Sequence, residues 1–288
     1  MTLLVHDPAY GNWVLGQHHP TQGRRFIHGA DLIAAQPGVR VERPQPASRT
    51  DLLRVHTADY VASVLQDYSC DEWVGARPDL ADLATLFVGG TLTALHALLN
   101  GEERVAVNLP GGKHHAQADH SSGFCVFADL AIAATVATEA GHRVAILDID
   151  AHHGDGTEAL CRDMAQVMTF SVHQQGIFPG TGLADDASAQ VYNEPLAAVL
   201  ATCILRGRSH ALWRWHSPST QPWCVLQPVR MVMCQIRCPV CVTPRLALST
   251  LGANSLVHSP ACPSSSPVLG DTATTMPRQH RGRRSSKV

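Results

Sequence analysis

Leu-Asp-Ile-Asp-Ala-His-His-Gly-Asp-Gly, at residues 147–156, directly follows the apolar residues 144–146. The stretch holds three carboxylates and two imidazoles in ten positions. Desolvating that many ionisable groups together is costly, so a buried strand that ends in them usually delivers metal ligands or proton-transfer groups. We therefore expect a reactive site at the edge of a sheet, immediately after this strand.

Strands and helices alternate along the first part of the chain. Apolar runs predict short buried strands at residues 3–5, 104–109, 143–150 and 167–173. Helical patterns lie between them, at residues 79–100, 127–140 and 157–164. This alternation implies parallel βαβ units and an open α/β fold. In such sheets functional groups gather beyond the carboxyl ends of the strands, which is where residues 147–156 lie.

Three ionisable residues after the apolar run share one face if residues 144–152 stay extended. Asp148, Asp150 and His152 then point the same way, each roughly 6–7 Å from the next. Asp150 and His152 can converge on one ion, and their oxygen and nitrogen donors suit Zn²⁺ or a similar divalent metal. Asp148 would lie slightly deeper, where it could orient a histidine or bind a cation through oxygen.

A second polar cluster, Pro-Gly-Gly-Lys-His-His-Ala at residues 110–116, also follows an apolar strand. Its glycines let the backbone turn sharply and approach a ligand closely. Adjacent histidines point in different directions, so they suit a general base and a second imidazole better than two ligands of one ion. Farther along, Phe124 and Phe178 stand beside glycines; they could line a narrow apolar slot or be ordinary core aromatics.

Five motifs together resemble the histone deacetylase superfamily, which includes bacterial acetylpolyamine amidohydrolases and acetoin-utilisation proteins. The motifs are Gly-Gly-Lys-His-His-Ala (111–116), Ser-Gly-Phe-Cys (122–125), Leu-Asp-Ile-Asp-Ala-His-His-Gly-Asp-Gly-Thr-Glu (147–158), Met-Thr-Phe-Ser-Val-His (168–173) and Phe-Pro-Gly-Thr-Gly (178–182). Their order and spacing make the likeness specific, and it runs from about residue 5 to residue 193. The resemblance implies an open parallel-sheet fold of the arginase and deacetylase kind.

The resemblance also implies a zinc-dependent amidohydrolase that removes acetyl groups from acetylated amines, either acetyl-lysine in proteins or acetylpolyamines. By position, His115 would be the general base and would pair with Asp155. His114 would be the second histidine and would pair with Asp148. A carboxylate behind each imidazole fixes its tautomer and raises its basicity, which suits these roles.

The resemblance also implies which residues contact the metal ions and the substrate. Asp150 and His152 would be two of three Zn²⁺ ligands. The side chains of Asp148 and Ser171, with nearby backbone carbonyls, would match a site for a monovalent cation such as K⁺. The tunnel for the acetylated amine would be shaped by Gly123, Phe124 and Phe178.

Two residues that the family pattern requires are not found in this sequence. The family has a third zinc ligand, an aspartate, well after the fifth motif, and later a Gly-Gly-Tyr whose hydroxyl helps to polarise the substrate carbonyl. After Glu194 the only acidic residue is Asp271, in a different context, and no tyrosine follows Tyr192. We therefore expect a fold that lacks its C-terminal strands and a polypeptide that is poorly active or inactive.

Charge divides the chain into two regions, 1–195 and 196–288. The first holds 11 basic and 23 acidic residues, whereas the second holds 11 basic residues and one acidic residue. We interpret the first as the N-terminal part of a deacetylase-like domain and the second as a compositionally distinct tail that is out of frame or disordered.

Three interpretations of this tail compete. It could be a separate zinc-binding module, because a Cys-x-x-Cys occupies residues 238–241, although no second half follows at finger spacing. It could be a basic tail that binds nucleic acid or an acidic partner, with four arginines within residues 278–284. Its lack of acids and loss of periodicity fit an out-of-frame translation best.

Other features limit the classes of function. Residues 1–7 show no pattern of a secretory signal, and we find no run that approaches the ~18 apolar residues of a membrane span. We expect a cytoplasmic protein that binds neither membranes nor nucleic acid. Two alternatives stay open: a binuclear manganese ureohydrolase of the arginase kind, suggested by Asp-Ala-His at 150–152, and a non-catalytic protein that holds acetylated ligands.

Overall fold

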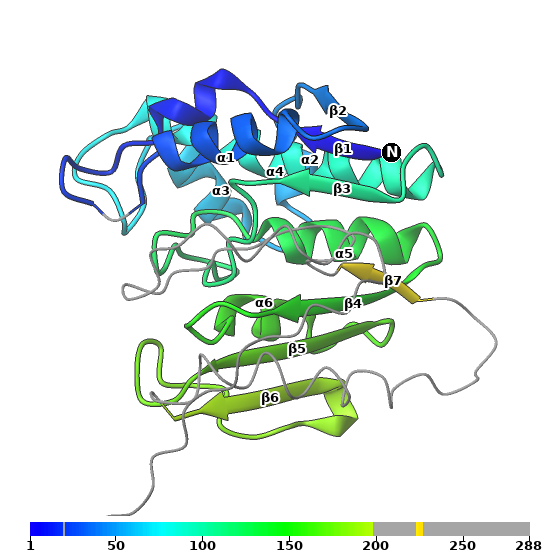
Figure 1. The fold of residues 1–288 in the computed structure, drawn as a ribbon. Helices are drawn as coiled ribbons and strands as arrows, with labels where there is room; N and C mark the ends of the chain where they lie inside the picture. Colours follow the sequence, from blue (N-terminus) through cyan, green and yellow to red (C-terminus); the bar gives the residue numbers. More distant parts are fainter. Residues whose placement is uncertain (20, 198–222, 227–288) are drawn as a thin grey trace, which may run out of the picture. The chain divides into compact units, whose positions relative to one another are not determined.

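The computed structural model describes residues 1–19, 21–197 and 223–226, in which parallel strands alternate with helices (Figure 1). The strands are β1 (Thr2–Val5), β2 (Val39–Glu42), β3 (Val105–Asn108), β4 (Arg143–Asp148), β5 (Val167–Gln174), β6 (Val191–Leu196) and β7 (Trp223–Leu226). The helices are α1 (Arg24–Ala34), α2 (Arg49–Leu52), α3 (Ala58–Leu65), α4 (Pro78–Leu99), α5 (Asp129–Glu139) and α6 (Asp155–Cys161), with short 3₁₀ helices η1 (Pro8–Asn12) and η2 (Ala187–Ala189).

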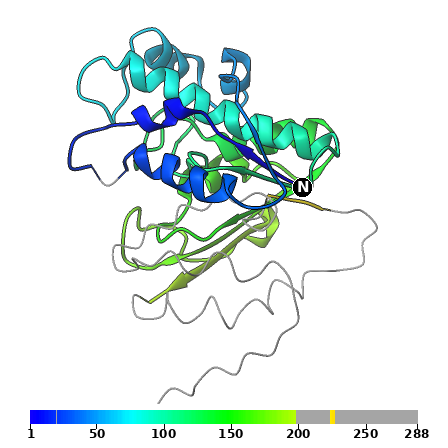
Figure 2. The same ribbon diagram turned by 45° about the horizontal axis from the view of Figure 1, so that its top comes forward.

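The strands form two sheets, in the orders β2-β1-β3 and β6-β5-β4-β7. Every pairing within them is parallel. Helix α4 packs on β1 and β3, α5 packs on β4 and α4, and α6 packs on β5 (Figures 1 and 2). The predicted open α/β fold with parallel strands is therefore confirmed.

Strand β4 is shorter than predicted. It ends at Asp148, whose Oδ1 accepts a hydrogen bond from the Asp150 backbone N–H at 3.0 Å. The next turn repeats this pattern, because Asp150 Oδ1 accepts from the backbone N–H of His152 at 2.8 Å. Short carboxylate side chains favour such local turns over continued extension. The predicted strand over residues 143–150 therefore ends two residues early, and the condition that residues 144–152 stay extended is not met. Turns, not strand alternation, bring these side chains together.

Helix α4 is the central apolar helix of the structure. By length and composition it could cross a membrane, but 67% of its most apolar window is buried within the protein. A Cβ on Gly89 would lie 1.8 Å from the backbone oxygen of Gln45, and one on Gly90 would lie 2.6 Å from Asn108 Oδ1. The glycine pair therefore lets neighbouring chain segments approach α4 closely, as expected of a buried core helix.

One strand, β7, comes from the predicted tail and pairs with β4 from Arg143↔Trp223 to Ile146↔Leu226. The Cys-x-x-Cys at 238–241 and the arginines within 278–284 lie outside the described residues. The domain boundary at residue 195 therefore stays a prediction.

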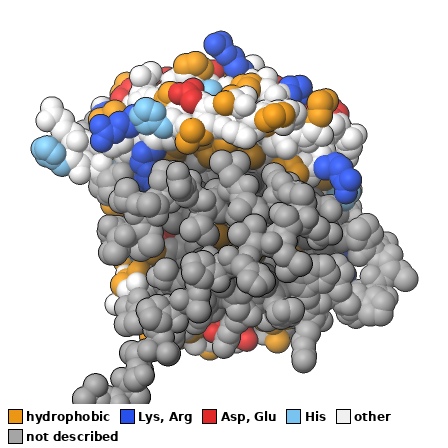
Figure 3. Space-filling view, in the orientation of Figure 1, with side chains coloured by type: hydrophobic (Ala, Val, Ile, Leu, Met, Phe, Trp, Pro, Cys, Tyr) orange, Lys and Arg blue, Asp and Glu red, His pale blue; other side chains and the backbone are white. Residues whose placement is uncertain are grey.

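The described surface mixes side chains of different kinds. On the face drawn in Figure 3, Lys and Arg side chains stand apart from one another, among hydrophobic and uncharged groups. On the described part of that face, the cationic groups do not gather into one stripe.

Candidate functional site

Two buried histidine–carboxylate pairs occupy the carboxyl edge of β3 and β4. His114 Nδ1 lies 2.6 Å from Asp148 Oδ2, and His115 Nδ1 lies 2.6 Å from Asp155 Oδ1. The histidines are only 4% and 3% exposed, and their ring centroids are 4.0 Å apart. Both pairings expected from the family resemblance are therefore present in the structure.

Their surroundings push the pKa values of the two imidazoles apart. Burial by itself lowers the pKa of His114, but the charge and the hydrogen bond of Asp148 outweigh it and raise the pKa to about 8. Burial also lowers the pKa of His115, and here the hydrogen bond that Asp155 accepts does not reverse the shift. Neighbouring groups whose pKa values diverge can divide acid and base roles between them.

The turn that precedes the histidines is held by Asp129, a fully buried residue at the start of α5. Its carboxylate accepts hydrogen bonds from the backbone N–H groups of Gly112 at 3.0 Å and Lys113 at 2.7 Å, and from Thr91 Oγ1 at 2.6 Å. We did not predict this role from the sequence. The available signal was an acid at the head of an otherwise apolar helix.

Helix α6 fixes the other side of the histidine pair. The Thr157 backbone N–H donates to the carbonyl oxygen of His114 at 3.0 Å. A Cβ on Gly156 would lie 2.3 Å from the carbonyl oxygen of Ala116, so only glycine allows this approach. The Gly-Asp-Gly sequence thus lets α6 start directly against the turn that carries the histidines.

Asp150 and His152 supply two donor atoms for a metal ion. Asp150 Oδ1 lies 3.0 Å from His152 Nδ1, close to the roughly 3.3 Å between two ligands of a tetrahedral Zn²⁺ with ~2.0–2.1 Å bonds. Asp150 Oδ2 is buried and has no hydrogen-bond partner, as expected of an oxygen atom that would bind a metal ion. Within residues 1–19, 21–197 and 223–226, however, no group of three or more His, Cys, Asp or Glu residues is placed to hold a metal. The donor set fits Zn²⁺ in part.

A cavity of about 410 Å³ opens over these groups. It is lined by Glu72, His114, His115, Ser122, Gly123, Phe124, Asp150, His152 and Phe178. The Phe178 ring lies 4.9 Å from that of His115 and the residue is 51% exposed, so it is no ordinary core aromatic. Gly123 must be glycine, because a Cβ there would lie 2.4 Å from the His115 ring. We did not single out Glu72 from the sequence, since a lone acid in a loop carries no distinguishing pattern.

Asp148 and Ser171, the residues matched to a monovalent-cation site, are register partners on β4 and β5. Ser171 Oγ lies 2.9 Å from His173 Nδ1, and both oxygens of Asp148 accept hydrogen bonds or ion pairs. The structure thus brings the two side chains to neighbouring positions. Their cation-binding role stays a prediction.

A family model described as the histone deacetylase domain matches residues 19–204. The chain belongs to the histone deacetylase family. Among the curated relatives, the acetoin utilization protein AcuC of Bacillus subtilis is 34% identical over 200 residues, covering 63% of this chain and 52% of that protein. Histone deacetylase 2 of Oryza sativa is 34% identical over 197 residues, covering 62% and 39%. Histone deacetylase B of Dictyostelium discoideum is 30% identical over 214 residues, covering 66% and 51%.

The match decides between the enzyme classes that the sequence left open. Membership of the histone deacetylase family favours a deacetylase-type hydrolase over a ureohydrolase of the arginase kind. The chain spans about half of the length of these relatives, or less. The matched region includes every residue that we assigned to the site.

Proposed function

We propose that this site hydrolyses the acetyl amide of an acetylated amine, either acetyl-lysine in a protein or an acetylpolyamine, with Zn²⁺ as its cofactor. The observation that carries the proposal is the pair of adjacent buried histidines, each with its own carboxylate, on the same cavity as Asp150 and His152. Family membership supports the same reaction class.

His115 is suited to accept a proton from the attacking water. Burial lowers its pKa, so it is neutral at physiological pH and free to act as a base. Asp155 engages Nδ1, which leaves Nε2 for proton transfer. A neutral imidazole with a fixed tautomer is what the first step of amide hydrolysis requires.

His114 is suited to the opposite role. With a pKa raised to about 8, it carries a positive charge near neutral pH. That charge stabilises the negative charge that develops on the substrate carbonyl, and one of the two histidines then returns a proton to the leaving amine. The two histidines thereby divide the proton transfers of one reaction between them.

Asp150 and His152 would hold the metal, and Zn²⁺, when bound, supplies polarisation of the amide carbonyl. Two donors hold an ion far more weakly than three. The sequence beyond Glu194 offers one acidic residue and no tyrosine. Without a carbonyl-polarising hydroxyl, the rate would fall by ~10²–10³. We therefore propose that this polypeptide retains the reaction's proton-transfer groups but binds metal weakly and turns over slowly.

The side chains that line the cavity also indicate which chemical groups the substrate contains. Its aromatic side chains, Phe124 and Phe178, suit the methylene chain of an acylated amine. Glu72 lines the same cavity and can accept a hydrogen bond from an amide N–H or an ammonium group. Both an acetyl-lysine peptide and an acetylpolyamine offer such donors, so both belong in the substrate panel.

A sensitive acetate-release assay with added Zn²⁺ tests the proposal. We expect slow hydrolysis of at least one acetylated amine, abolished in H115A. The matched control is H120A, because His120 also pairs with an aspartate but is an exposed residue outside the cavity lining. Equal activity in H115A and the unaltered chain would contradict the assigned base.

A further inference from the structure

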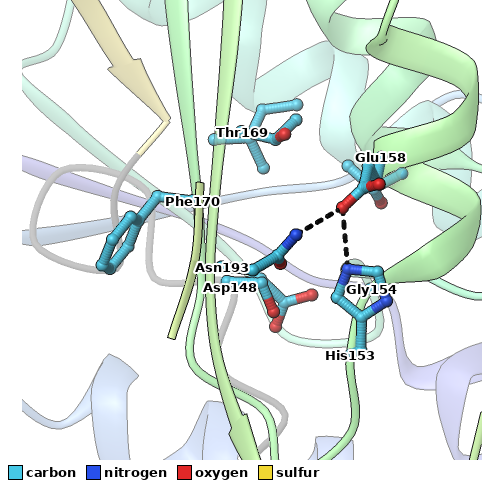
Figure 4. A pocket seen from close by; sticks show the side chains of 10 residues that line it. Asp148, His153, Gly154, Glu158, Thr169, Phe170 and Asn193 are labelled. Carbon is cyan, nitrogen blue, oxygen red and sulfur yellow. Dashed lines mark hydrogen bonds and ion pairs between the residues drawn. The ribbon is translucent and has the colours of Figure 1, made fainter. Parts of the chain in front are cut away.

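A second and much smaller cavity lies between α6 and the sheet formed by β4, β5 and β6 (Figure 4). Its volume is about 10 Å³, which is enough for one water-sized species. Asp148 and Ser171 are among its lining residues, but it also extends two residue pairs deeper along the strands, to Ile146 and Thr169. It is therefore distinct from the large cavity over the histidines.

Three oxygen atoms of lining residues are buried and have no hydrogen-bond partner: Thr157 Oγ1, Thr169 Oγ1 and Asn193 Oδ1. Thr157 is only 3% exposed and Thr169 only 8% exposed. Buried polar atoms in folded proteins are almost always paired with the protein or with ordered water. Three unpaired oxygens around one small cavity therefore indicate an occupant that bonds to all of them.

The charges around the cavity indicate that this occupant is neutral. Glu158 Oε2 lies 2.9 Å from His153 Nε2 and accepts from Asn193 Nδ2 at 2.9 Å, as Figure 4 shows. Its other oxygen accepts from Arg162 at 2.8 Å. Asp148 is likewise paired with His114. Both carboxylates are already compensated, so a further cation would find little uncompensated negative charge.

We propose that this cavity holds one buried water molecule. The two threonine hydroxyls can donate to it, and its own protons can go to Asn193 Oδ1 and to a carboxylate oxygen of Glu158 or Asp148. Four partners around one site match the two to four hydrogen bonds that buried waters make. The water would complete the hydrogen bonding of all three unpaired oxygens.

The water would also join the sheet to α6. Thr169 and Asn193 lie on β5 and β6, whereas Thr157 lies in the helix that carries Asp155. Because the Thr157 backbone also binds the His114 carbonyl, the water adds a link between the far strands and the histidine pair. This role is structural and does not depend on whether the chain hydrolyses amides.

A crystal structure of the full chain, grown in rubidium salt, tests the occupant directly. We expect a density peak within hydrogen-bond distance of Thr157 Oγ1 and Thr169 Oγ1, with no anomalous signal at that peak at the rubidium edge. Rubidium bound at the monovalent-cation site predicted for Asp148 and Ser171 would give a separate peak. An anomalous peak at the two threonine hydroxyls would show an alkali cation instead, and an empty cavity would show that the oxygens are unpaired. Either of these results overturns the proposal.

The variant T169V supplies a second test, because the sign of its effect on stability shows whether a water molecule bonds to Thr169. If a water bonds to Thr169, replacing the hydroxyl with a methyl group should lower the folding equilibrium constant about tenfold, as for one buried hydrogen bond. If the hydroxyl has no partner, the same change should leave stability unaltered or raise it. The control is T135V, whose hydroxyl bonds to a carbonyl of its own helix and should matter little. A T169V chain that is as stable as the unaltered one, or more stable, would overturn the proposal.

Discussion

His56 should make the stability of this chain fall steeply in mild acid. The side chain is 4% exposed and has partners at both ring nitrogens. Its Nδ1 lies 2.9 Å from the Gln117 carbonyl oxygen, and its Nε2 accepts a hydrogen bond from the Ala128 backbone N–H at 2.9 Å. These contacts fix the neutral tautomer with its proton on Nδ1. A second proton, on Nε2, would face the N–H group of Ala128.

The magnitude follows from the pKa of His56. Burial lowers it from 6.5 to about 4, against the opposing effect of the Gln117 hydrogen bond. Between pH 6.5 and about pH 4, His56 is protonated in the unfolded chain but stays neutral in the folded chain. The free energy of unfolding therefore falls as the pH falls through this window. At ~1.4 kcal/mol per pKa unit, the loss reaches roughly 3 kcal/mol. Above pH 7 the effect vanishes.

Urea unfolding at a series of pH values, compared between the unaltered chain and H56Q, isolates this contribution. At pH 8 the variant should be less stable by about 2 kcal/mol, because it loses two buried hydrogen bonds. Toward pH 4 the gap should close and then reverse, because protonation destabilises only the unaltered chain, by roughly 3 kcal/mol. H142Q, which replaces an exposed histidine, controls for the substitution and should change stability by less than ~0.5 kcal/mol at pH 8. A gap between H56Q and the unaltered chain that is independent of pH would refute the reasoning.

Two further substitutions test the packing and the substrate contact of the site. G156A should lower stability by about 2–3 kcal/mol in urea unfolding, since its Cβ would lie 2.3 Å from the Ala116 carbonyl oxygen. G16A is the control, because nothing lies within 4 Å of a Cβ there, and equal stability of the two variants would contradict the predicted clash. E72Q should weaken the binding of an acetylated peptide about fivefold, as measured by calorimetry, through loss of a charge-assisted hydrogen bond. Unchanged affinity would remove Glu72 from the substrate contacts.

The pairings of the site were predictable because its motifs resemble those of the histone deacetylase superfamily. That resemblance implied that His114 pairs with Asp148 and His115 with Asp155, and the structure places both pairs within hydrogen-bond distance. The residues alone predicted only that these groups follow buried strands. The close approach of α6 depends on a local feature, the glycine at position 156. The family motifs were enough for the two pairings, whereas the close approach at Gly156 was found only in the structure.

Other features depend on contacts that no local pattern reveals. The early end of β4 is a local exception: the strand was predicted to reach residue 150, but the carboxylates of Asp148 and Asp150 accept hydrogen bonds from backbone groups two residues ahead and bend the chain. Asp129 supports the histidine turn through backbone groups 16 and 17 residues away. Such side chain–backbone bonds between distant segments can be found only when the fold places them together.

The central claim is that this chain keeps both histidine–carboxylate pairs but, among its described residues, only two donors for a metal ion. The most direct test is the amount of Zn²⁺ that remains bound per chain after dialysis of the purified full-length protein. The account predicts well under one equivalent, with no further loss in H152A. One tightly held equivalent, lost in H152A, would show that a third ligand is present and would contradict the claim.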